Sequence, residues 1–417
     1  MSEWMRLGTC AVIQKGKPPM PLGGDGKNAE PYLNPEYLRG RSSAIMARAR
    51  TDSVRAHSGD TVLLWDGSNA GEFFRAKVGL VASTMARISQ VGSFRSDYFF
   101  HALKNSEHYL RSQTNGTGIP HVDREVLESI TLFCPDSEVQ GVVATVLDTL
   151  DTAIHETEAL IAKLKAVKQG LLHDLLTRGI DANGELRLPQ SEAPHLYKSS
   201  LLGWIPTDWE TPCFSALQFQ PLLGVGVRGA SEDAANYGLL KMGNLRENNE
   251  IDLRSVELVA ASRVLHADKL LLSEGDLLFN TRNTPELVGK TCSWRDVEAE
   301  HVFDNNILRA RIPSHIGSGH FFAHYLGSEV GRRRVRRLAT GTTSVAAIYW
   351  KDLKGLRVPA PSTQEQNAIH RIIDEHDKSR AFTERNMIAL HEAKLGLMHD
   401  LLTGRVRVTP LLDAATA

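Results

Sequence analysis

The chain has 417 residues, which is too long for one ordinary core and predicts two or three domains. Apolar and charged contents are those of a globular protein, no run of 18 apolar residues occurs, and the start MSEWMRLGTC lacks the apolar core of a signal peptide. These features exclude a membrane span and predict a cytoplasmic protein. The net charge of −1 leaves nucleic-acid binding open, but any anion-binding surface must come from local segregation of charge.

Residues 1–135 are predicted to form a first globular module of short strands and turns. A strand begins at Ala11 and runs into a basic Gly/Pro loop, and another, Val62–Trp65, ends in an Asp-Gly turn. Arg95–Arg111 has helical spacing of its apolar residues and is followed by a polar loop. The module therefore combines α and β elements.

A stretch that occurs twice dominates the rest of the sequence. Shifting Pro135–Ile180 by 226 positions (361 minus 135) aligns it without a gap on Pro361–Val406, and about a third of the positions are identical. Apolar or small residues recur at spacings of three and four, as in a narrow coiled-coil seam. We expect two long helices that pair with each other, although two separate amphipathic core helices are the alternative interpretation.

Each long helix is expected to begin with a capping box and to carry one apolar seam along its length. Ser137 with Gln140, and Thr363 with Gln366, match the S/T-x-x-Q capping box, in which the glutamine amide bonds back to the cap. The seam of the first helix is expected at Val139, Val143, Val146, Leu150, Ala153, Thr157, Leu160, Leu164, Val167 and Leu171. That of the second is expected at Ile369, Ile372, His376, Ser379, Thr383, Met387, Leu390, Leu397 and Leu401.

Between the helices, residues 181–203 are polar and contain two prolines, which predicts an exposed connection rather than a folded unit. Residues 204–361 then repeat the order of the first module, with a Gly-rich basic loop, a Gly-Asp turn before an apolar strand, and a helix before a Thr/Gly loop. The predicted organisation is a tandem duplication with the following segments: 1–135 and 204–361, globular modules; 136–180 and 362–406, long helices; 181–203, linker; 407–417, tail.

The strongest local signal for nucleic-acid binding is an arginine-rich helix, GRRRVRRL. Five guanidiniums in six positions cannot all be paired by Glu329, and the arginine fork suits phosphate oxygens and guanine edges. A solvated helical face is the alternative interpretation. The residues are Arg332, Arg333, Arg334, Arg336 and Arg337.

Other candidate DNA contacts are polar or basic side chains in the loops of both modules, where plain surface or turn-forming roles are alternatives. Ser68 and Asn69 in one module and Arg282 and Asn283 in the other are expected at equivalent places. The full set outside the arginine-rich helix is Lys15, Lys17, Ser68, Asn69, Arg111, Gln113, Thr114, Asn115, Arg228, Arg282, Asn283, Thr340 and Thr342.

Motifs for catalysis and cofactor binding were not found. The sequence has no G-x-x-x-x-G-K-[ST] phosphate loop, and its four cysteines lack C-x-x-C spacing. Asn34-Pro35-Glu36-Tyr37 is similar to the Asn-Pro-Pro-aromatic motif of amino-methyltransferases, but Glu36 replaces the second proline. We therefore expect no catalytic residue, no metal site and no cofactor in this chain.

The repeat and its surroundings resemble the DNA specificity subunit of bacterial type I restriction–modification systems. The similarity is closest in LDTLDTAIHETEALIAKLKAVKQGLLHDLLTRGIDANGELR, GWIPTDWE and HDLLTGRV, and spans essentially the whole chain. The resemblance implies an α/β (α+β) fold: two target-recognition domains separated by an antiparallel coiled coil of two long helices, with pseudo-twofold symmetry. Each domain would recognise one half of a split double-stranded DNA target.

The resemblance also implies partners that supply the chemistry. Two methyltransferase subunits would bind S-adenosylmethionine and methylate adenine, and restriction subunits would use ATP and Mg²⁺ for translocation and cleavage. The competing hypothesis is a protein–protein adaptor, whose modules bind peptides and whose helices are spacers. An adaptor would lack the steep salt dependence that phosphate contacts give to DNA binding.

Overall fold

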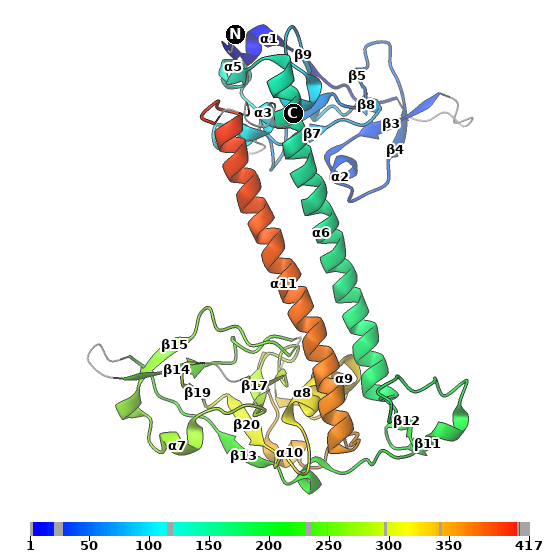
Figure 1. Ribbon diagram of the computed structural model, residues 1–417, viewed down its shortest axis with the longest axis vertical. Helices are drawn as coiled ribbons and strands as arrows, with labels where there is room; N and C mark the ends of the chain where they lie inside the picture. The colour runs from blue at the N-terminus through cyan, green and yellow to red at the C-terminus, as the bar shows by residue number, and fades with distance from the viewer. Residues whose placement is uncertain are drawn as a thin grey trace, which may run out of the picture. The chain divides into compact units, whose positions relative to one another are not determined.

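The structure is a computed structural model that describes residues 3–20, 28–114, 120–230, 235–247, 249–295, 298–341, 344–406 and 408 (Figure 1). It divides into two compact units. Unit 1 comprises Met1–Leu160 and Thr383–Ala417, and unit 2 comprises Ile161–Phe382. Each unit contains one globular α/β module together with one segment from each of the two long helices, α6 (Ser137–Thr177) and α11 (Thr363–Leu401). The mixed fold class and the two long helices expected from the sequence are confirmed.

The first module, in unit 1, is built on two four-stranded sheets of strand order β2-β9-β6-β7 and β4-β3-β8-β5. Its elements are β1 (Glu3–Arg6), α1 (Leu7–Cys10), β2 (Ala11–Lys15), β3 (Ala29–Leu33), α2 (Pro35–Leu38), β4 (Ile45–Arg48), β5 (Arg55–Ala56), β6 (Thr61–Leu64), β7 (Phe73–Arg75), β8 (Gly79–Val81), β9 (Met85–Gln90), α3 (Ser96–Asn105), α4 (Glu107–Ser112), α5 (Arg124–Ser129) and β10 (Thr131–Cys134).

The second module, in unit 2, has a four-stranded sheet of order β13-β20-β16-β18 and two three-stranded sheets, β15-β14-β19 and β17-β22-β21. Its elements are η1 (Pro194–Leu196), β11 (Tyr197–Ser200), β12 (Gly203–Pro206), η2 (Phe214–Leu217), β13 (Gln220–Leu223), β14 (Asn236–Leu240), β15 (Glu257–Ala260), η3 (Ala261–Arg263), α7 (Ala267–Leu270), β16 (Leu277–Asn280), β17 (Arg282–Asn283), β18 (Thr291–Ser293), β19 (His301–Phe303), β20 (Ile307–Arg311), α8 (Gly319–Gly327), α9 (Glu329–Arg336), β21 (Thr340–Gly341), β22 (Ala346–Ala347) and α10 (Trp350–Leu353).

The two modules share one topology. In each, β2 or β13 lies at the edge of an antiparallel sheet beside β9 or β20, and a second sheet contains a parallel pair, β3–β8 or β14–β19. A glycine follows this edge strand in both modules and packs closely against the backbone of another strand or loop. A Cβ on Gly16 would lie 2.1 Å from the Ala82 carbonyl oxygen, and a Cβ on Gly224 would lie 2.0 Å from the Phe303 carbonyl oxygen. A side chain would not fit at either place, which explains the matched glycines.

The long helices pack against each other in each unit. In unit 1, Val143 and Leu147 of α6 share a buried cluster with Met398 and Leu401 of α11. In unit 2, Leu175 and Leu176 of α6 share one with Ile369 and Ile373 of α11. Early residues of one helix thus meet late residues of the other, so the segments run antiparallel.

One of the two rows predicted for the seam of α6, the row that contains Val143, lies on the buried face, and the other row is displaced by one residue. On α6 every seventh residue is buried, namely Gln140, Leu147, Ile154, Ile161, Lys168 and Leu175. Two residues assigned to the seam, Leu160 and Val167, are instead 47% and 48% exposed. The spacing of apolar residues misled because the true seam includes polar side chains. Lys168 is only 6% exposed and its ammonium lies 2.6 Å from an Asp377 carboxylate oxygen in unit 2.

The same ion pair recurs in unit 1 between Lys394 and Asp151. Lys394 is the repeat counterpart of Lys168, and Asp377 that of Asp151, since each pair of positions differs by 226. Each lysine stem is covered by the helix pair while its charge meets a carboxylate of the opposite helix. The internal repeat is therefore expressed as two equivalent contacts, one in each unit.

The predicted capping boxes are also corrected. α11 begins after Ser362, whose hydroxyl accepts from the Glu365 amide (3.2 Å), so Gln366 is one position too late to close a box. Instead, the Gln366 side-chain oxygen accepts from the Ser318 amide (2.8 Å), at the start of α8. Gln140 does the same with the Arg95 amide (2.8 Å), at the start of α3. The glutamines thus attach each module to its helix.

Most of residues 181–203 are exposed, as the sequence predicts, but part of the segment is folded. Tyr197–Ser200 and Gly203–Pro206 form an antiparallel hairpin, and Ala193 and Tyr197 are buried. Arg187 makes an ion pair with Glu365 at the start of α11 (2.5 Å). The polar composition of the segment concealed this ion pair, because the other charged residues around Arg187, such as Asp181 and Glu185, are exposed.

Substitution of the buried Gln140 by leucine is expected to destabilise unit 1 by about 2 kcal/mol, because the Arg95 amide and the Ser93 and Pro135 carbonyls lose their partner. The measurement is hydrogen exchange of the peptide containing Arg95. Gln366→Leu is the matched control and should accelerate exchange at Ser318 in unit 2 instead. Faster exchange of both peptides in both variants would contradict the separate attachments.

Candidate DNA interface

In the first module, several predicted contact residues gather where β2 and β6 end. The Lys15 ammonium lies 2.8 Å from the Asp66 carboxylate and 5.7 Å from the centre of the Trp65 ring. Arg111, at the end of α4, donates to the Asn69 side-chain oxygen (3.0 Å). We call this group of residues the first tip. It offers a carboxylate, an amide and two cations on adjoining loops.

The remaining predicted residues of this module lie around the first tip or beside it. Lys17, Ser68 and Gln113 are exposed, and the Thr114 hydroxyl donates to the Arg111 carbonyl (3.1 Å). Asn115 lies outside the described residues. The hydroxyl and amide groups that point to solvent can donate to phosphate oxygens or to base edges.

In the second module the corresponding group is built around Arg282 on β17, and we call it the second tip. Arg282 is exposed and donates to the Tyr349 hydroxyl (3.2 Å), while the Lys351 ammonium lies 5.9 Å from the centre of the Tyr349 ring. Asn283 donates to the Asn280 side chain (2.9 Å), and Thr340 is exposed on the neighbouring β21. Thr342 falls outside the part of the chain that is described.

Arg228 is not part of the second tip. It is exposed beside Gly229, whose carbonyl accepts from Ala260 at the end of β15, and its own carbonyl accepts from Arg263 (2.6 Å). These contacts place it at the β15-β14-β19 sheet. The structure therefore does not bring Arg228 together with Arg282 and Asn283.

Hydrogen bonds show which tip residues are equivalent. Trp65 donates its amide to the Thr84 carbonyl and accepts from Val122, and Thr281 does the same with Asn306 and Ile348. The residue that follows is Asp66 in one module and Arg282 in the other. Asn283 thus matches Gly67 rather than Asn69, and the expected alignment was shifted by two residues. Equivalent positions carry opposite charges.

The arginine-rich helix α9 corrects one premise of the sequence argument. Its guanidiniums find partners other than Glu329: Arg332 pairs with Glu247 (2.7 Å), Arg334 donates to the Tyr325 hydroxyl (2.9 Å), and Arg336 donates to the Glu286 carbonyl. Arg333 pairs with Glu329 (2.7 Å). Arg337 is exposed, with no side-chain partner among the described residues. Most of this charge is therefore held within unit 2.

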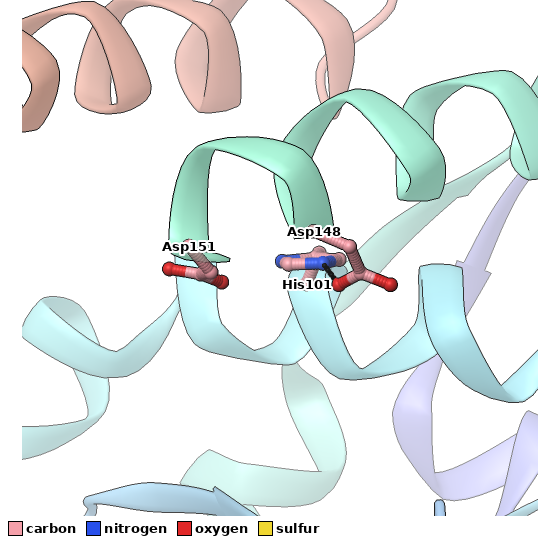
Figure 2. Close-up of side chains that lie close together, drawn as sticks. All are labelled: His101, Asp148 and Asp151. Carbon is pink, nitrogen blue, oxygen red and sulfur yellow. Dashed lines mark hydrogen bonds and ion pairs between the residues drawn. The ribbon is translucent and has the colours of Figure 1, made fainter. Parts of the chain in front are cut away.

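One group of side chains in unit 1 has the spacing of metal ligands. Figure 2 shows His101 of α3 directed at Asp148 of α6, with Asp151 one turn along, and their ligand atoms all lie within 4.8 Å of one another. However, Arg75 of β7 pairs with Asp148, and Lys394 pairs with Asp151. A cation would have to displace a guanidinium and an ammonium, so the geometry fits an ion-pair joint better than a metal site.

The joint attaches the first module to the long helices. His101 Nε2 lies 2.7 Å from Asp148, and burial lowers the pKa of His101 more than this contact raises it. The repeat counterpart of Asp148 is Asp374, which pairs with Arg295 of the second module. Each unit thus contains an ion pair between an arginine of its module and an aspartate of a long helix, and the two aspartates are at equivalent positions of the repeat.

The methyltransferase-like motif and the possibility of a membrane span can both be compared with the structure. Asn34 caps α2, its side-chain oxygen accepting from the Tyr37 amide (2.8 Å), which gives this methyltransferase-like motif a structural role. In the described residues, no helix combines the length and apolar character needed to cross a membrane.

Comparison with known proteins is consistent across sequence and structure. Residues 3–166 match the family model described as type I restriction modification DNA specificity domain. The type I restriction enzyme MjaVIII specificity subunit of Methanocaldococcus jannaschii is 28% identical, over 98% of this chain and 94% of that protein. The EcoBI specificity subunit of Escherichia coli is 21% identical over 82% of this chain and 71% of its own length.

Two solved structures have the same fold over nearly all of the chain. The S subunit of a type I restriction–modification system from M. genitalium matches with a TM-score of 0.61 and 13% identity, covering 96% of both chains. A chain from a study of complex assembly and conformational transition of the type I system matches with a TM-score of 0.52 and 13% identity, covering 96% of this chain and 97% of that one. Residues 3–166 thus match a type I restriction modification DNA specificity domain, and the whole chain is similar to specificity subunits of type I restriction–modification systems.

Proposed function

We propose that this chain is the sequence-specific DNA-binding subunit of a type I restriction–modification complex and recognises a bipartite duplex target. The first and second tips would each recognise one half-site. The observation that carries the proposal is that the two modules share a topology while their equivalent tip positions hold Asp66 and Arg282. A carboxylate accepts from cytosine, whereas a guanidinium donates to guanine, so the two halves would differ in sequence.

The long helices would serve as the scaffold for two methyltransferase subunits, and restriction subunits would join that core. Large apolar side chains are exposed on these helices, where they do not contribute to either module's core: in unit 1, Leu160, Ile388 and Leu395; in unit 2, Val167 and Phe382. Exposed apolar residues on a helix are typical of surfaces that bind another protein. They support the assembly role.

The chain itself would carry out no reaction. S-adenosylmethionine would be bound by the methyltransferase subunits, and ATP and Mg²⁺ by the restriction subunits. The contribution of this chain would be to place DNA and partners together.

The proposal is tested by selecting bound duplexes from a randomised pool with the complex of this chain and its methyltransferase subunits. Two conserved blocks separated by an unspecified gap of constant length are expected. Arg282→Ala should relax the preference at one base pair of one block by about 1–3 kcal/mol. Asp66→Ala, the matched variant of the other module, should relax the other block. A single continuous block, or both variants acting on the same block, would argue against two separate recognition modules.

A further inference from the structure

Unit 2 contains a large cavity of about 980 Å³ between α6, α9 and Arg380 of α11, which we call the basic groove. Lys165 and Gln169 of α6 line one wall, and Arg332, Arg333 and Arg336 of α9 line the other. The groove therefore joins a long helix to the arginine-rich helix of the second module.

The charge of the groove is positive. Six cations line it: Lys165, Lys168, Arg332, Arg333, Arg336 and Arg380. The lining carboxylates are Glu247 and Glu329, and two more, Asp377 and Glu250, pair with lining cations. Among these side chains, six cations and four carboxylates make the lining predominantly basic. An anionic ligand is therefore favoured.

The groove continues toward the second tip. Arg336 lines the groove and donates to the carbonyl of Glu286, in the loop that follows Arg282 and Asn283 of β17. A nucleic-acid strand whose bases meet the second tip would therefore have its backbone directed to the arginines of the groove. Arginine forks suit phosphate oxygens.

The internal repeat distinguishes DNA from a protein partner. Lys165, Gln169 and His173 form a stripe with i, i+4 spacing along α6 and all line the groove. Their counterparts on α11, 226 positions later, are His391, Leu395 and His399. A surface for two copies of one partner should be similar in both repeats, whereas only the histidine of this stripe, His173 and His399, is repeated. The groove is therefore a feature of the second module and not of the part of the long helices that is repeated.

We propose that the basic groove binds backbone phosphates of duplex DNA beside the half-site of the second module, and that α6 itself contributes to DNA binding. This inference rests on the proposed function and extends it, because the long helix then acts in affinity as well as in spacing. The contacts are to phosphate and would not select bases.

The test changes the charge at Gln169 in the full-length chain, in complex with its methyltransferase subunits. Gln169→Lys should steepen the slope of log affinity against log salt by about 0.9, as one added phosphate contact does, and Gln169→Glu should make it shallower. Gly170→Lys and Gly170→Glu are matched controls, since Gly170 neighbours Gln169, is absent from the groove lining and has open space for a side chain. Affinity is measured by fluorescence anisotropy with the selected duplex.

Equal slopes in wild type and both Gln169 variants, or equal changes in the Gly170 variants, would overturn the inference. So would loss of methyltransferase binding in Gln169→Glu, which would assign the groove to a protein partner. Inorganic pyrophosphate without DNA tests for a free phosphate ligand: a rise in Tm that Gln169→Glu removes would assign the groove to a small anion instead. If wild type selects no DNA sequence, the proposed function itself fails, which is a separate result.

Discussion

Replacement of Glu365 by alanine is expected to destabilise unit 2 by about 3–5 kcal/mol, because three donors lose a buried acceptor and Arg187 keeps only the exposed Asp208 as its ion-pair partner. The Glu365 carboxylate accepts from the Ile180 amide (2.9 Å), from Arg187 (2.5 Å) and from the Trp209 indole N–H (3.1 Å). Glu365 and Trp209 are both buried. One carboxylate at the start of α11 therefore joins the end of α6 to the segments on either side of the linker hairpin.

The chain passes close to this carboxylate. A Cβ on Gly179 would lie 2.2 Å from the Glu365 carboxylate, and Gly179 has a φ of +64°. Among the described residues, no other acceptor bonds to the Ile180 amide or to the Trp209 indole N–H. The loss should therefore approach the full cost of unsatisfied buried donors.

The measurement is urea unfolding followed by tryptophan fluorescence, with hydrogen exchange at Ile180 to assign the change to unit 2. Glu365→Gln keeps an acceptor but removes the charge, so its loss should be smaller than that of alanine. Glu375→Ala, at an exposed position of the same helix, should have little effect. If Glu365→Ala and Glu375→Ala are equally stable, the carboxylate is not the junction described.

The sequence predicted the long helices well because the repeat made them visible, but one of the two rows of the seam of α6 was misplaced by one residue. Lys168 belongs to the seam, and Leu160 and Val167 do not, because the buried face is decided by what the opposite helix offers, here Asp377. No pattern within one helix contains that information. The capping boxes failed for a similar reason, since Gln140 and Gln366 bond to their modules.

The linker shows the same limit. Arg187 lies in a polar stretch, and only the folded chain reveals that its partner, Glu365, is 178 residues away. Polar composition predicts an exposed segment when local sequence is considered alone. A long-range ion pair and a two-stranded hairpin are decided by tertiary contacts.

For the candidate interface, the loops after matched strands were predictable from turn signals, and several of their residues do meet at the tips. Asp66, Tyr349 and Lys351 were missed. Asp66 appeared to be only part of a turn. Tyr349, whose hydroxyl accepts a hydrogen bond from the Arg282 guanidinium, lies 67 residues from Arg282 in the sequence. Aligning the ends of the repeated strands would have exposed Asp66, whereas nothing in the sequence links Tyr349 to the second tip.

Acidification is expected to destabilise unit 2 between about pH 6.5 and pH 4, because three neighbouring histidines fold in their neutral form. His320 and His370 stack with ring centres 4.1 Å apart, and His324 Nε2 lies 3.3 Å from His370 Nδ1. Burial is the main cause that lowers the pKa of all three, and it lowers that of His370 to about 4. The unfolded chain binds these protons near pH 6.5, so stability is complete above that pH and is lost below it.

The charged groups around these rings act in both directions. Glu274, which pairs with His320 (2.7 Å), and Asp374 favour the protonated forms. Arg295 opposes protonation of all three rings, as do Lys168 at His324 and Lys378 at His370. Burial and these cations outweigh the carboxylates, which is why the direction of the shift is downward in each case.

For His370 alone, a pKa of about 4 in the fold and about 6.5 in the unfolded chain gives a loss of about 2 kcal/mol at pH 5, and about 3 kcal/mol once both forms are protonated. The measurement is urea unfolding at pH 7.5 and pH 5, with hydrogen exchange to follow unit 2. His370→Gln removes one titrating ring from the stack, while protonation of surface carboxylates is common to both proteins. The variant should lose less stability between the two pH values than wild type does, and an unchanged difference would mean that this ring does not resist protonation in the fold.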